Sequence, residues 1–334
     1  MNSADQVAAS GVLAIDAGNS KTDVVLVAPD GSVLGHARGG GFRPHQVGAD
    51  AAVTGLGPLL GEVARAAGVT KRDDEPWVGH VSACLANADL EVELQRLQLR
   101  IEQERWGLTT YVGNDTFALL RLGVDGPPGV AVVCGAGINC AGLHPDGRVA
   151  RFAALGKISG DWGGGAFLAE EALFWASRCA DGRGPQTSLA QLLPEHFGTV
   201  DMEALLEAVH LGRILEVRMR EAVPLLFRAA DDGDEVATSV VMRQADEVVA
   251  LAVSALERLD LLGEPVHVIL GGGVLTAGHA MLLDQIDAGL ASRAPKAHAR
   301  VVSAPPVVGA ALLGLDRIGA GPDAAARLRE AFRA

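Results

Sequence analysis

The residues best suited to chemistry form a short polar stretch between two apolar runs. The stretch is Asp16-Ala17-Gly18-Asn19-Ser20-Lys21-Thr22-Asp23, and the runs are Val12–Ile15 and Val24–Val27. Short Val, Ile and Leu runs around a turn containing Gly and Asn predict a β-hairpin. The turn could bind a phosphate, because backbone N–H groups and the Ser20 and Thr22 hydroxyls can point toward an anion while Lys21 adds positive charge. Asp16 could hold a hydrated cation. An ordinary hairpin with a polar turn is the alternative.

A second candidate is the carboxylate of Asp115. The segment Gly113-Asn114-Asp115 follows the predicted strand 109–112, and a helix is expected from about 116 to 122. A carboxylate at the end of a strand can accept a proton from a hydroxyl that attacks phosphorus, as a general base does. The same position also suits a helix N-cap, so both roles are open for Asp115.

Two glycine turns follow predicted strands in the second half of the chain. Gly135-Ala136-Gly137 follows the strand 130–134, and Gly271-Gly272-Gly273 follows the strand 266–270. In open α/β sheets, ligands bind where strands end. The first turn could bring N–H groups against a second phosphate, and the second could leave a flat surface for adenine or ribose. Their alternatives are a tight hairpin turn and a strand-to-helix turn that needs a positive φ.

Two further loops could contact a ligand. Ser159-Gly160-Asp161-Trp162-Gly163-Gly164-Gly165 is rich in glycine, which is costly in chain entropy unless the backbone must come close to something. Asp161 could accept hydrogen bonds from sugar hydroxyls, or it could act as an N-cap. The second loop, 38–45, combines glycines with Arg, His and Phe, and it is either a ligand loop or a flexible connection.

The order of predicted elements indicates an α/β fold with a largely parallel sheet. A strand, a Gly turn, a strand, an Asp-Gly turn and a third strand occur near 12–37 and again near 130–153, which predicts a duplicated domain. Helices are expected at 51–67, at 90–105, at 202–230 with a break near Pro224, and at 235–262. Residues 1–10 are expected to be disordered. We expect an N-terminal domain at 11–120, with the C-terminal helix 306–333 as a candidate to complete it, and a C-terminal domain with helical insertions at 121–305.

Composition limits the possible partners and compartment. The chain has 334 residues, 49% of them hydrophobic, and a net charge of −13, which argues against a nucleic-acid surface. No apolar run reaches the roughly 20 residues that span a bilayer, and no signal peptide is expected. The four cysteines, at Cys84, Cys134, Cys140 and Cys179, lack C-x-x-C spacing. We therefore expect reduced thiols in a cytoplasmic protein without a membrane or nucleic-acid partner.

Taken in order, these motifs resemble those of sugar kinases in the actin/hexokinase superfamily. The resemblance is strongest to the N-acetylglucosamine kinase branch, which is grouped with the ATPases that activate benzoyl-CoA reductase, and it covers about Val12 to Leu315. It implies duplicated ribonuclease H-like domains around a central cleft, which binds ATP with Mg²⁺ and a sugar. It also implies a homodimer.

The resemblance also implies roles for individual residues. The stretch from Asp16 to Thr22, including Gly18, Asn19 and Lys21, resembles the first phosphate loop, with Ser20 as the phosphate-contacting hydroxyl and Asp16 on Mg²⁺ through water. Asn114-Asp115 resembles the segment with the general base. Gly135-Ala136-Gly137-Ile138-Asn139-Cys140 resembles the second phosphate loop, usually Gly-Thr-Gly-Ser-Asn-Cys, whose Asn contacts sugar. Gly271-Gly272-Gly273 resembles the adenosine motif.

The chain departs from the family pattern mostly around the sugar. Gly160-Asp161-Trp162-Gly163-Gly164 resembles a Gly-Asp-Glu-Gly-Ser segment whose Asp binds sugar hydroxyls, but Trp162 replaces the Glu. Ala136 and Ile138 replace two hydroxyl residues, Leu155 stands where the family has Trp, and His45 falls where the family often has an Asn that contacts the sugar.

The resemblance favours ATP-dependent phosphorylation of an amino sugar, with N-acetylglucosamine at its 6-hydroxyl as the leading substrate and Asp115 as the base. Asn114, Asp115, Asn139, Gly160, Asp161 and His45 are the expected sugar-binding residues. Glucosamine and N-acetylmuramic acid are the alternative substrates. Two other classes stay open, a reductase-activating ATPase and a sugar or nucleotide sensor without turnover. The activator would need cysteines that hold an iron–sulfur cluster, and Cys84 and Cys179 lie in the wrong contexts for that.

Overall fold

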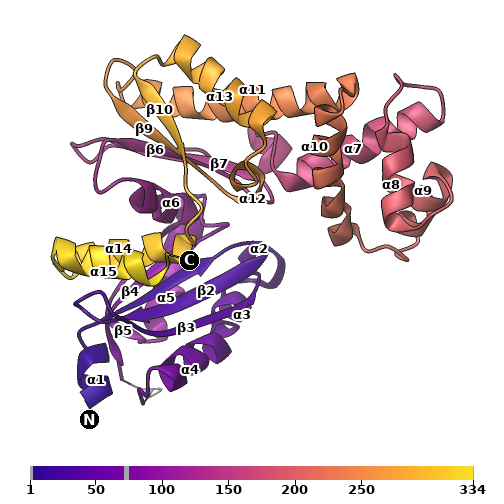
Figure 1. Cartoon of the computed structure of the whole chain (residues 1–334). Helices are drawn as coiled ribbons and strands as arrows, with labels where there is room; N and C mark the ends of the chain where they lie inside the picture. The colour runs from indigo at the N-terminus through magenta and orange to yellow at the C-terminus, as the bar shows by residue number, and fades with distance from the viewer. Residues whose placement is uncertain (1–2, 71–74, 334) are drawn as a thin grey trace. The chain divides into compact units, whose positions relative to one another are not determined.

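The computed structural model describes residues 3–70 and 75–333, and it contains two mixed β-sheets with flanking helices (Figure 1). The strands are β1 (Val12–Ala17), β2 (Lys21–Val27), β3 (Val33–Gly40), β4 (Val78–Leu85), β5 (Gly107–Asn114), β6 (Gly129–Cys134), β7 (Ile138–Leu143), β8 (Val149–Arg151), β9 (Val266–Gly271) and β10 (Ala297–Val301).

The helices connect and follow these strands. They are α1 (Ser3–Ala8), α2 (Pro44–Val47), α3 (Ala49–Thr54), α4 (Gly57–Ala66), α5 (Glu91–Gln103), α6 (Asp115–Gly123), α7 (Gly165–Ala180), α8 (Leu189–Phe197), α9 (Met202–His210), α10 (Ala222–Asp231), α11 (Glu235–Arg258), α12 (Gly273–Thr276), α13 (Ala280–Arg293), α14 (Pro306–Arg317) and α15 (Pro322–Ala331), with 3₁₀ turns η1 (Gly156–Ser159) and η2 (Glu216–Glu221).

The first sheet has the strand order β3-β2-β1-β4-β5. Strands β1, β2 and β3 are antiparallel, whereas β1, β4 and β5 run parallel. The register pairs Ala17 with Leu85 and Leu85 with Asn114, so the three parallel strands end at the same edge. The side chains that follow these strands are therefore brought together, as expected at the carboxyl edge of a parallel sheet.

The second sheet repeats the arrangement of the first. Its order is β10-β9-β6-β7-β8, which is the order of the first sheet when each strand is replaced by its counterpart in the repeat. The predicted α/β fold and its duplication are confirmed. The prediction of a largely parallel sheet was wrong, because the first three strands of the first sheet are joined by tight antiparallel hairpins.

Several helix predictions need correction. Residues 3–8, expected to be disordered, form α1. The helix expected at 51–67 is two helices, α3 and α4, because the regular helical hydrogen-bond pattern is interrupted at Gly55 and Leu56, although both residues keep right-handed helical φ and ψ. The helix expected at 202–230 is interrupted at 211–215, not at Pro224, because Pro224 lies in the first turn of α10 where its missing N–H costs little.

The chain forms two compact units. Unit 1 comprises residues 1–131, 141–153 and 302–334, and unit 2 comprises 132–140 and 154–301. In unit 1, alternate residues of β1 face opposite layers: Leu13 and Ile15 join the core under α4 and α5, and Val12 and Ala14 join the core under α6, α14 and α15. Figure 1 shows the C-terminal helices, in yellow, beside the first sheet. No helix in the described part of the chain is long and apolar enough to cross a membrane.

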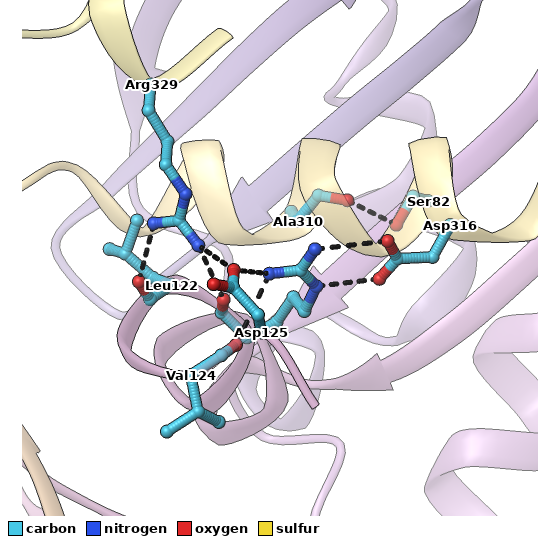
Figure 2. A network of polar contacts seen from close by, with 8 residues as sticks. Ser82, Leu122, Val124, Asp125, Ala310, Asp316 and Arg329 are labelled. Atoms are coloured by element: carbon cyan, nitrogen blue, oxygen red, sulfur yellow. Dashed lines mark hydrogen bonds and ion pairs between the residues drawn. The ribbon is translucent and has the colours of Figure 1, made fainter. Parts of the chain in front are cut away.

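A polar network attaches the C-terminal helices to α6 (Figure 2). The Arg121 guanidinium donates to both carboxylate oxygens of Asp316, at 2.7 and 3.1 Å, and to Asp125 at 3.1 Å. Arg329 of α15 donates to the Leu122 carbonyl at 2.7 Å and to Asp125 at 3.1 Å. The network therefore fixes α6, the helix that begins at Asp115, against α14 and α15.

We predict that Arg121→Ala lowers the free energy of unfolding of the protein by about 1–3 kcal/mol, because it removes charge-assisted hydrogen bonds from a side chain that is only 11% exposed. The matched control is Arg183→Ala, whose ion pair with Asp181 is exposed at the surface and should contribute less than about 0.5 kcal/mol. Denaturant titration measures both. Equal losses in the two variants would contradict the role of this network.

Candidate active site

The turn between β1 and β2 is held rigidly by the loop that follows β3. The Gly18 N–H donates to the Lys21 carbonyl at 2.8 Å, and the Phe42 N–H donates to the Gly18 carbonyl at 2.9 Å. The Asn19 carbonyl accepts from Arg43 Nε at 2.9 Å, and Asn19 Oδ1 accepts from Asn87 Nδ2 at 2.9 Å. The turn is thus preorganised, which is what anion binding by backbone N–H groups requires.

The polar side chains of this turn differ in their exposure to solvent and therefore to a ligand. Ser20 and Lys21 are exposed, whereas the Thr22 hydroxyl is buried in β2 and presents no open face to a ligand. Lys21 Nζ lies 3.9 Å from Asp23, which also accepts from Arg38 at 2.7 Å and pairs with His36 at 3.1 Å. Arg38 thus pairs with the buried Asp23 carboxylate, and His36 adds a hydrogen bond to it.

Asn114, not Asp115, is the N-cap of α6. Asn114 Oδ1 accepts from the Thr116 N–H at 3.0 Å and from its hydroxyl at 2.6 Å. Asn114 Nδ2 donates to Asp89 Oδ1 at 2.8 Å, and the Asn114 side chain is buried. Both ends of the amide are therefore engaged in structure, although the sequence suggested a sugar contact. Because Asn114 is the cap, the Asp115 carboxylate, which directly follows β5, is not needed for capping.

The carboxyls at this edge of the first sheet have raised pKa values. Burial raises the pKa of Asp16 to about 8, and the negative charges of Asp115 and Asp23 add to the effect. Burial also raises the pKa of Asp115 to about 6, against a smaller lowering by the backbone N–H groups of Thr116 and Asp115. Acids with such pKa values change protonation near neutral pH, as general acids and bases do.

Asp89 is a member of this cluster that the sequence reasoning missed. Burial, followed by the charges of Asp115 and Glu93, raises its pKa to about 7. The Arg151 guanidinium donates to the Ala88 and Asp89 carbonyls at 3.2 and 3.3 Å, which fixes the chain after β4. The signal was present in the sequence, because Asp89 follows a buried strand closely, as Asp115 does.

The residues of this edge fit a hydrated divalent cation. A buried carboxyl with a raised pKa beside two further carboxyls is a position where positive charge is favourable. Among residues 3–70 and 75–333 there is no group of three His, Cys, Asp or Glu side chains arranged to hold a metal. Mg²⁺ keeps several waters, so Asp16 could hold it through water only together with substrate phosphates.

His45, the residue that the resemblance suggested for a sugar contact, is exposed on the short helix α2.

In unit 2, three glycine segments that lie far apart in sequence come into backbone contact. A Cβ on Gly272 would lie 2.5 Å from the Cys134 carbonyl carbon and oxygen, and a Cβ on Gly164 would lie 2.5 Å from Gly137. Both glycines have positive φ, at 87° and 88°. No other residue type fits either position without a backbone shift. The glycine turn at 271–273 and the turn at 135–137 are therefore neighbours.

The loop after η1 completes this part of unit 2. Gly160 is exposed and has a left-handed backbone conformation. Asp161 is partly buried and accepts a hydrogen bond from the Ser159 hydroxyl. Asn139 Oδ1 accepts from the Cys140 N–H at 2.7 Å. Asp161 is not an N-cap, because the cap of α7 is Gly164.

Comparison with known proteins identifies the family of this sequence and proteins that are similar to it. Residues 13–314 match the BadF/BadG/BcrA/BcrD ATPase family. An N-acetyl-D-glucosamine kinase from Dictyostelium discoideum is 27% identical over 91% of this chain and 97% of its own. An N-acetylmuramic acid/N-acetylglucosamine kinase from Clostridium acetobutylicum is 26% identical over 49% of this chain and 54% of its own.

A solved structure shows the same fold. It is a candidate N-acetylglucosamine kinase from Chromobacterium violaceum, which superposes with a TM-score of 0.72 at 23% identity and covers 92% of this chain and 99% of its own. The fold class and the resemblance drawn from the sequence are both confirmed. The chain belongs to the BadF/BadG/BcrA/BcrD ATPase family.

Proposed function

We propose that this protein is an ATP-dependent amino-sugar kinase that transfers the γ-phosphoryl group to the 6-hydroxyl of N-acetylglucosamine. The observation that carries the proposal is Asp115, a partly buried carboxyl with a pKa raised to about 6, which follows β5 and is relieved of capping by Asn114. The substrate class follows the relatives, whose names specify N-acetylglucosamine or N-acetylmuramic acid.

In the proposed reaction, the Asp115 carboxylate accepts the proton of the sugar hydroxyl as its oxygen attacks the γ-phosphorus of ATP. A bond forms between that oxygen and phosphorus, the bond from the γ-phosphorus to the bridging oxygen breaks, and ADP leaves. Such a base contributes about 10²–10⁴-fold. Mg²⁺, held through water by Asp16, would supply charge neutralisation at the phosphates.

Each unit has its own candidate ligand segments in this proposal. In unit 1, the Gly18 N–H is used within the turn, so the backbone at 19–20 and the exposed Ser20 and Lys21 side chains would bind phosphate. In unit 2, the turn at 135–137 would bind a second phosphate, the turn at 271–273 would bind adenosine, and Asp161 and Asn139 would bind sugar hydroxyls. Loss of the usual hydroxyls at Ala136 and Ile138 leaves backbone N–H groups as the phosphate donors there.

The alternative classes fit the structure less well. A reductase activator needs accessible cysteines for an iron–sulfur cluster, but Cys84, Cys134 and Cys140 are buried and Cys179 is the one that is partly exposed. Glucosamine and N-acetylmuramic acid stay alternative substrates. The homodimer and the cytoplasmic location implied by the resemblance stay predictions, which gel filtration and fractionation would test.

We predict that the wild-type protein releases ADP from MgATP with one amino sugar, and that Asp115→Asn lowers kcat by about 10²–10⁴-fold because the base is lost. The panel contains N-acetylglucosamine, glucosamine and N-acetylmuramic acid, and NMR of the product locates the phosphate. Binding of ADP by the variant, measured by calorimetry, is the control for folding. Slow ATP hydrolysis that no sugar stimulates would refute the kinase proposal.

The kinase should lose activity in acid. Asp115 must be deprotonated to act as a base, and its pKa of about 6 lies above its ordinary value, so the inactive protonated form dominates below that pH. We predict that kcat/KM falls about tenfold per pH unit below about pH 6. Asp16 and Asp89 titrate in the same cluster, so ADP binding is followed over the same range as a control. A flat profile between pH 5 and 8 would argue against Asp115 as the base.

The adenosine role of the turn at 271–273 can be tested with a matched pair of glycines. Gly272→Ala should weaken ADP binding at least tenfold, because its Cβ would collide with the Cys134 backbone. Gly278→Ala is the control, because Gly278 also has a positive φ, of 75°, but has no atom within 4 Å of the added Cβ. Calorimetric titration with ADP compares them. Similar weakening in both would show that strain alone, and not the contact, is responsible.

A further inference from the structure

Gln244 of α11 is a fully buried polar side chain that none of the sequence motifs includes. Its exposed fraction is 0%, and its Oε1 accepts from the Gly164 N–H at 2.8 Å. Because that donor must face an oxygen, the orientation of the amide is fixed. The Nε2 atom then has no hydrogen-bond partner among the described residues. A buried amide with an unsatisfied donor costs stability, so its presence in the core points to a role for its acceptor oxygen.

The amide of Gln244 lies directly against the backbone of Gly163 and Gly164. A Cβ on Gly163 would lie 2.8 Å from Gln244 Nε2 and 2.9 Å from Oε1, and Gly163 has a φ of 130°. On its other side, this segment contacts the turn at 135–137, because a Cβ on Gly164 would lie 2.5 Å from the Gly137 backbone. The segment is therefore enclosed between the Gln244 amide and the turn.

Hydrogen bonds join the same segment to the turn. The Gly165 N–H donates to the Gly135 carbonyl at 2.8 Å, and the Ala166 N–H donates to the Ala136 carbonyl at 2.9 Å. The Gly135 N–H in turn donates to the Gly137 carbonyl at 2.9 Å. Each of these contacts involves backbone atoms, so a displacement of Gly164 is passed directly to residues 135–137.

The neighbouring residue of α11 supports the same loop. The Arg243 guanidinium lies 4.1 Å from the centroid of the Trp162 ring, which is itself buried. Cation–π stacking of this kind contributes about 0.5–2 kcal/mol. Arg243 thus holds the loop at Trp162, while Gln244 holds it at Gly164.

From these contacts we infer that Gln244 is a positioning residue for the turn at 135–137 and for the loop that carries Asp161. Its Oε1 fixes Gly164, and Gly164 with the next two residues fixes the turn. The inference rests on the proposed function for what the turn binds, namely a phosphate of the nucleotide. Gln244 itself touches neither substrate.

The test compares three variants. Gln244→Met keeps a similar side-chain volume but removes the acceptor, and Gln244→Glu keeps an acceptor oxygen. Val249→Ala is the matched control on the same helix, because Val249 is buried against Gly289 of α13 and has no part in the loop. The readouts are the Kd for ADP, the KM for ATP, kcat, the melting temperature and hydrogen exchange of residues 162–166.

We expect Gln244→Met to weaken ADP binding and raise the KM for ATP by about 10- to 100-fold, since small misplacements of binding groups cost that much. Exchange of the Gly164 amide should accelerate. Val249→Ala should lower the melting temperature and leave the Kd unchanged. Gln244→Glu should bind ADP within about threefold of the wild type, because the acceptor for the Gly164 N–H is retained.

The inference is overturned if Gln244→Met binds ADP as Val249→Ala does, or if Gln244→Glu loses binding by tenfold or more. The second criterion holds even if Gln244→Met does not fold. If the wild type binds ADP but phosphorylates no sugar, the kinase proposal fails while the Kd comparison still decides the role of Gln244. If the wild type does not bind ADP, the inference fails with it.

Discussion

The structure depends on one electrostatic constraint, the gathering of carboxyls at a sheltered edge of the first sheet. The parallel strands β1, β4 and β5 end in register, which brings Asp16 and Asp115 to one edge, and Asp89 follows β4 closely. Burial raises the pKa values of all three carboxyls, and the charge of Asp115 adds to the effect at Asp16 and Asp89. Such an arrangement costs stability in the empty protein, and it becomes favourable when a cation or a donated proton enters. This electrostatic cost supports the proposal that the edge binds a cation and a substrate whose hydroxyl gives up a proton.

In unit 2 the main constraint is close packing of backbone against backbone at three glycine-containing segments. Glycine at 164 and 272 allows three segments to touch without side chains between them. Contacts of this kind tolerate little movement, because a backbone atom cannot rotate away as a side chain can. Such a segment has to be held in place, and Gln244 and Arg243 both hold the loop at 162–164 from a single turn of α11.

Sequence reasoning found what depends on local pattern. Apolar runs followed by Gly or Asp correctly placed Asp16, Asp115 and the turns at 135–137 and 271–273 at the ends of strands, and the repeated order of turns predicted the duplication. It did not find roles that depend on distant contacts. Gln244 bonds a residue 80 positions away, and a helical pattern gives no sign of that. The capping role left open for Asp115 belongs to Asn114, one residue earlier, because both residue types suit an N-cap and the choice depends on φ and ψ.

Trp162 shows why a departure from a family pattern must be judged in three dimensions. In the resembled segment a Glu stands at this position, next to the Asp that binds sugar. Here the ring is buried and stacks under Arg243, so the replacement changes how the loop is supported. A Glu at this point would place a buried carboxylate near Asp161 and Glu247, whose pKa is already raised by burial. The substitution therefore leaves Asp161 without a neighbouring carboxylate at position 162, and Asp161 stays the proposed acceptor for sugar hydroxyls.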